Sequence, residues 1–76
     1  MTKDESYIIA LYKAAGKGGL KNRYEIGRQV GLSERAVNAI LNGLEQANFV
    51  KKVEETAVCL TANGEALAIR LLEDYS

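Results

Sequence analysis

Few side chains in this sequence could perform covalent or acid–base chemistry. The chain has no His and a single Cys, so the Ser-His-Asp and Cys-His sets of hydrolytic enzymes are excluded. A structural zinc site formed by this chain alone is also excluded, because it needs four Cys or His ligands. Carboxylates, Lys, Tyr and Cys59 remain, in a chain with little room for a pocket. We therefore expect no enzyme, no metal and no cofactor.

Cys59 is the one thiol, and it cannot form an internal disulfide, which is typical of a reducing compartment. It lies between Val58 and Leu60 in an apolar stretch, and no neighbouring cation in the sequence would activate it. A small packing residue is favoured over a redox-sensing thiol.

The composition is that of a small folded domain. Of the 76 residues, 47% are apolar and 26% are charged, unlike a disordered chain. This length allows one domain, which we expect to span residues 1–76. No apolar run approaches the roughly 18–20 residues of a membrane helix, and the polar segment Met1–Ser6 is unlike a signal peptide. The sequence therefore predicts a cytoplasmic protein without a membrane partner.

Charge is balanced overall but unevenly distributed. The chain has 10 basic and 10 acidic side chains, and its calculated pI is 6.2. Six basic and two acidic residues lie between Lys13 and Arg35, whereas three basic and six acidic residues follow from Ala36 onward. One part of the sequence is therefore basic, although the whole lacks the basic signature of a nucleic-acid-binding domain.

The charged and polar side chains of this sequence are expected to be positioned by short helices. Apolar residues at helical spacing predict helices over about 3–15, 23–30 and 34–47. Thr2, Asn22 and Ser33 are the expected N-cap residues. The glycines at 16, 18 and 19 end the first helix; because they follow a helix rather than a strand, a phosphate-binding loop is not indicated. Gly31 suits the left-handed turn between the second and third helices, so these two form a helix-turn-helix.

The helical spacing of apolar residues ends after Asn48. Two β-prone stretches, 49–54 and 57–60, predict a hairpin around Glu55-Thr56, whose register is left open because no Asn-Gly type turn is present. Thr61 then caps a helix over about 62–74. The expected fold class is mainly α with a small β-hairpin (α+β): a three-helix core, the hairpin and a C-terminal helix.

Three stretches have the form of motifs from one known fold family. They are Glu25-Ile26-Gly27-Arg28-Gln29-Val30-Gly31-Leu32-Ser33, the segment from Ala36-Val37 to Asn48-Phe49-Val50, and Leu60-Thr61-Ala62-Asn63-Gly64. In this order they resemble the second helix, recognition helix and post-wing helix of winged helix-turn-helix regulators of the MarR-like and PadR-like kinds. The resemblance covers nearly the whole chain. Gly27 would lie at the crossing of the second and third helices, and Asn48 at a position that tolerates positive φ.

The resemblance implies double-stranded DNA as the partner, with the third helix in the major groove. The implied base-contacting residues are Ser33, Arg35, Asn38 and Asn42, since Arg pairs bidentately with guanine and Asn with adenine. The implied phosphate contacts are Arg23 and Arg28 on the second helix and Lys51 and Lys52 on the wing. On a strand, the two lysines would point to opposite faces.

Some residues depart from the family's pattern and favour an alternative. Glu54-Glu55 is acidic at the wing tip, where basic residues are common, and Glu34 begins the recognition helix. The alternative is a winged-helix module that binds another protein and not DNA.

A homodimer is also expected, because specific recognition usually needs two half-sites about one helical turn apart. Tyr7, Ile9 and Ile69 are the candidate contacts, as apolar groups of the first and last helices that the core does not obviously require.

Overall fold

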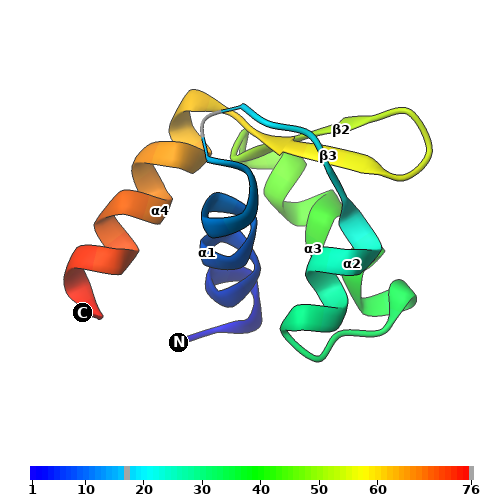
Figure 1. Ribbon diagram of the computed structural model, residues 1–76, viewed down its shortest axis with the longest axis horizontal. Helices are drawn as coiled ribbons and strands as arrows, with labels where there is room; N and C mark the ends of the chain where they lie inside the picture. The colour runs from blue at the N-terminus through cyan, green and yellow to red at the C-terminus, as the bar shows by residue number, and fades with distance from the viewer. Residues whose placement is uncertain (17, 76) are drawn as a thin grey trace.

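The computed structural model describes residues 1–16 and 18–75 (Figure 1). Its elements are α1 (Lys3–Ala15), β1 (Lys21–Asn22), α2 (Arg23–Gln29), α3 (Glu34–Gln46), β2 (Val50–Val53), β3 (Ala57–Leu60) and α4 (Ala62–Asp74). The predicted helices and hairpin are present within one or two residues, which confirms the α+β class. Lys17, part of the glycine-rich connection, lies outside the described residues. Within the described ranges, no helix is long and apolar enough to cross a membrane.

Each helix begins at a side chain that accepts hydrogen bonds from its first turn. The Thr2 hydroxyl accepts from the Glu5 N–H at 3.1 Å, and the Glu5 carboxylate accepts from the Thr2 N–H at 2.9 Å, which forms the predicted capping box. Asn22, Ser33 and Thr61 cap α2, α3 and α4. Helix starts are therefore determined locally, and this explains their agreement with the sequence.

Helix α1 lies at the centre of the molecule, with α4 on one side and α2 and α3 on the other (Figure 1). It also contacts the sheet. Tyr7 is fully buried and Ile9 is only 8% exposed, so the prediction that they are spare groups available for a dimer contact is wrong. The helical spacing of apolar residues predicts one buried face for a helix. It does not predict that a helix such as α1 is packed against other elements on several sides.

The hairpin belongs to a three-stranded antiparallel sheet of order β1-β3-β2. Val50 pairs with Leu60 and Lys52 with Val58, which fixes the register that the sequence left open. The two residues of β1 pair with Val58 and Ala57 of β3. This strand was not predicted, because two residues carry no periodic signal. It joins the chain immediately before α2 to the wing, β2–β3.

Two backbone expectations are confirmed. A Cβ at Gly27 would collide with Val37 Cγ2, so the glycine permits the close crossing of α2 and α3. Asn48 has φ +64° at the exit from α3, the left-handed conformation expected there.

Candidate nucleic-acid interface

Helix α3 has one buried face and one polar face. Val37, Leu41 and Leu44 lie in the core. Arg35, Asn38 and Asn42 are exposed on the other side of the helix. Ser33 is also exposed, and its Oγ accepts from the Ala36 N–H at 3.2 Å, so its capping role is visible. The four predicted base-contacting residues therefore lie together at the surface.

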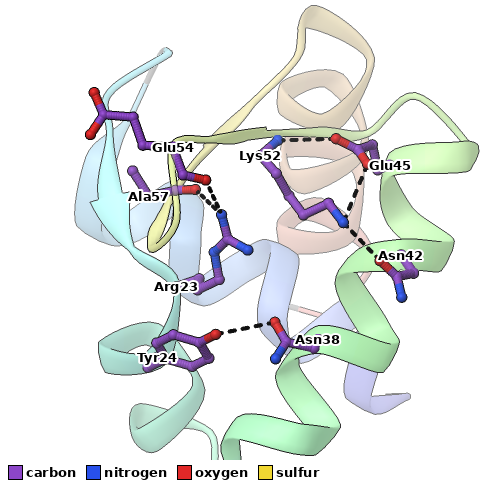
Figure 2. Close-up of polar contacts among 8 residues, drawn as sticks. All are labelled: Arg23, Tyr24, Asn38, Asn42, Glu45, Lys52, Glu54 and Ala57. Carbon is purple, nitrogen blue, oxygen red and sulfur yellow. Dashed lines mark hydrogen bonds and ion pairs between the residues drawn. The ribbon is translucent and has the colours of Figure 1, made fainter.

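Asn38 has a partner on the neighbouring helix. The Tyr24 hydroxyl of α2 donates to Asn38 Oδ1 at 3.3 Å (Figure 2). Tyr24 is half-buried and packs against the core. Tyr24 is not among the residues that the sequence singles out, since no local spacing connects residues of two different helices. The structure adds it to the site.

Asn42 is bound to the wing. Lys52 Nζ donates to Asn42 Oδ1 at 2.7 Å and lies 3.5 Å from Glu45 Oε1 (Figure 2). The main-chain N–H of Lys52 also donates to Glu45 Oε2, at 3.3 Å. Lys52 would have to leave both side chains to reach a phosphate. The predicted opposite orientations of the lysines agree with the half-buried state of Lys52 and the exposure of Lys51.

Arg23 is not at the surface. It is 6% exposed, and its Nη2 donates to the carbonyl oxygens of Ala57 at 2.8 Å and Glu54 at 3.3 Å (Figure 2). Its main-chain oxygen accepts from the Tyr7 hydroxyl at 2.8 Å. The prediction of a phosphate contact is wrong for this residue, because its side chain holds the wing turn instead of facing solvent.

The remaining charges of this side of the molecule have both signs. Arg28 and Lys51 are exposed, as a phosphate contact requires. Glu34, Glu54 and Glu55 are exposed too, and Glu34 lies in the first turn of α3, where a negative charge is favourable to the helix. Opposite charges thus alternate around α3 and the wing.

Helix α4 carries the exposed apolar groups that could serve a second copy. Ile69 is 41% exposed and Tyr75 is 55% exposed. Of the three predicted dimer residues, only Ile69 is therefore accessible. Cys59 is half-buried in β3. In the described part of the chain, no three His, Cys, Asp or Glu residues are grouped as metal ligands would be.

A scan against protein-family models and a search of curated proteins found no match. Solved structures do resemble the chain. Ligand-free NadR has a TM-score of 0.73 and 27% identity, and NMB1585, a MarR family regulator from Neisseria meningitidis, has a TM-score of 0.74 and 18% identity. Each alignment covers 97% of this chain and 54% of the other, so the chain spans about half the length of these proteins. SSV1 F-93 has a TM-score of 0.70 and 25% identity, with coverage of 99% and 91%.

The architecture and these likenesses define the class: the chain has the winged-helix, MarR-like fold. In that fold α2 and α3 are the helix-turn-helix and β2–β3 is the wing.

Proposed function

We propose that the chain is a cytoplasmic transcriptional regulator that binds double-stranded DNA, with α3 in the major groove and the wing beside it. The observation that carries the proposal is the exposed face of α3, which holds Arg35, Asn38 and Asn42, with Asn42 hydrogen-bonded to Lys52 of the wing. These side chains can form hydrogen bonds with base edges. Ser33 lies at the start of the same helix, where recognition helices commonly contact bases.

Phosphate contacts are assigned to the exposed cations at the edges of this face. Arg28 lies in the last turn of α2, and Lys51 lies on the exposed side of β2. So few cations would give weak binding that decreases steeply with salt, because affinity for DNA depends on the number of phosphates neutralised. A second copy of the chain would double the contacts. We propose a homodimer through α4, where Ile69 and Tyr75 are exposed.

A salt titration of binding to random-sequence duplex DNA tests the proposal. We expect measurable affinity at low salt, and the logarithm of the binding constant should fall linearly with the logarithm of the salt concentration. Arg35→Ala and Asn38→Ala should each weaken binding to a selected site by about 1–3 kcal/mol and random DNA much less. Arg70→Ala is the matched control, since it removes a charge from α4, which α1 separates from α3 (Figure 1). Absence of binding at low salt would refute the proposal.

The second candidate is a module that binds a protein through the same face. It is favoured by one observation, the exposed carboxylates of Glu34, Glu54 and Glu55 around α3 and the wing turn, which phosphates would repel. Under this alternative, the salt titration gives no DNA binding at any salt concentration.

A further inference from the structure

The two exposed amides of α3 have the same orientation. Asn38 Oδ1 accepts from the Tyr24 hydroxyl, and Asn42 Oδ1 accepts from Lys52 Nζ. Figure 2 shows each amide oxygen on the side of its donor and each amide nitrogen turned away from it. Residues four apart lie on one face of a helix, so the two NH₂ groups are presented together.

The orientation of Asn42 is fixed by chemistry. An ammonium group has donors and no acceptor, so only the amide oxygen can face Lys52. A flipped amide would place its NH₂ hydrogens against those of the ammonium. Lys52 is itself held by Glu45, which accepts from its main-chain N–H and lies 3.5 Å from its Nζ. The docking of β2 on α3 thus determines which half of the Asn42 amide is free.

An amide held in this way presents its NH₂ group as a donor, while one lone pair of its oxygen is already occupied by Lys52. Adenine presents one acceptor and one donor in the major groove, N7 and N6–H₂, and bidentate pairing with Asn uses both halves of the amide. Guanine presents two acceptors, N7 and O6, which suit a group that only donates. Arg35 also has donors and no acceptor.

Resting on the proposed function, we infer that Asn42 on this α3 face selects guanine rather than adenine, with Lys52 as its positioning residue. This differs from the Asn–adenine pairing that the sequence suggested. It also gives Lys52 a role other than phosphate contact.

Selection from a random duplex library tests the inference, with base preferences compared among folded variants. The Asn42 position is the one whose preference disappears in Asn42→Ala. There we expect the wild type to prefer G·C over A·T by about 5–150-fold. Lys52→Met should reduce this preference at least about fivefold, because the amide becomes free to rotate. Lys52→Arg should retain it, since a guanidinium also donates.

Lys51→Met is the matched control, because it removes the same charge from the adjacent residue of β2, which is exposed and lies on the other face of the strand from Lys52. It should weaken all duplexes alike and leave the base preference unchanged. Tyr24→Phe should leave the preference at the Asn42 position unchanged, because the Tyr24 hydroxyl bonds to Asn38. A wild-type preference for A·T, or a preference unchanged in Lys52→Met, would overturn the inference while DNA binding stands. No binding of the wild type to any duplex would instead overturn the proposed function, and the inference with it.

Discussion

Arg23→Met separates a structural arginine from a DNA-binding one. The substitution keeps an unbranched side chain but removes the guanidinium, and with it the hydrogen bonds from Nη2 to the carbonyl oxygens of Ala57 and Glu54. Both oxygens belong to the wing turn or its edge, so losing these hydrogen bonds weakens the attachment of the wing to the start of α2. The pairing of β1 with β3 and the main-chain bond from the Arg23 N–H to the Thr56 oxygen remain. Because Arg23 is 6% exposed, water does not readily replace the missing donor.

The expected cost follows from these contacts. A hydrogen bond from a charged donor contributes about 1.5–3 kcal/mol, and the 2.8 Å bond to Ala57 is the stronger of the two. Part of this is offset because a desolvated guanidinium is removed, whose Nε has no hydrogen-bond partner within the described structure. A net loss of roughly 2–3 kcal/mol lowers the melting temperature of a domain of this size by about 8–24 °C.

Urea and thermal denaturation followed by circular dichroism measure this loss. Arg28→Met is the control, because Arg28 is exposed on the same helix. The free energy of unfolding of this variant should differ from that of the wild type by no more than about 0.5 kcal/mol. Random-DNA affinity, measured where both variants are folded, should decrease for Arg28→Met and change little for Arg23→Met. Unchanged stability with reduced affinity in Arg23→Met would show that this arginine contacts phosphate and that the reasoning is wrong.

Three further perturbations test other parts of the structure. Gly64→Ala should destabilise the fold by roughly 1–3 kcal/mol, because the added Cβ would collide with the Phe49 main chain. Gly43→Ala is the control: no atom lies within 4 Å of the added Cβ, so it should stabilise the helix by about 0.5–1 kcal/mol. Equal denaturation midpoints for the two variants would contradict this. Burial raises the pKa of Tyr7 well above 10, so the folded protein keeps a proton that the unfolded chain loses. Stability should therefore fall as pH rises above about 10, less steeply in Tyr7→Phe; identical slopes would exclude Tyr7 as the cause. Ile69→Glu should shift a dimer to monomer in sedimentation, and a monomeric wild type at tens of micromolar would refute the dimer in solution.

The parts of the fold that the sequence predicts are those with local causes. Thr2, Asn22 and Ser33 accept hydrogen bonds from residues two or three positions later, so each helix start can be inferred from a short stretch. The polar face of α3 follows from its period, which places Arg35 and Asn38 opposite the buried positions.

The parts that the sequence did not predict depend on residues distant along the chain. Arg23 is buried against the carbonyl oxygens of two residues that lie 31 and 34 positions later in the chain. No short stretch of sequence around Arg23 contains these acceptors. The partner of Asn38 is 14 residues away on another helix, and that of Asn42 is 10 residues away on a strand. Type and spacing locate the candidate residues, but only the packing of β2 on α3 shows which half of an amide is free.

The central position of α1 has a consequence for synthesis on the ribosome. Its apolar residues are covered in part by α4, which begins only at Ala62, whereas α1 ends at Ala15. The 46 residues between these two helices, 16–61, take roughly 2–9 s to translate at about 5–20 residues per second. During that interval α1 lacks one of the elements that it packs against in the folded protein. Nascent chains that stop before α4 should therefore be bound by chaperones and cut by protease within α1, and longer ones should be protected.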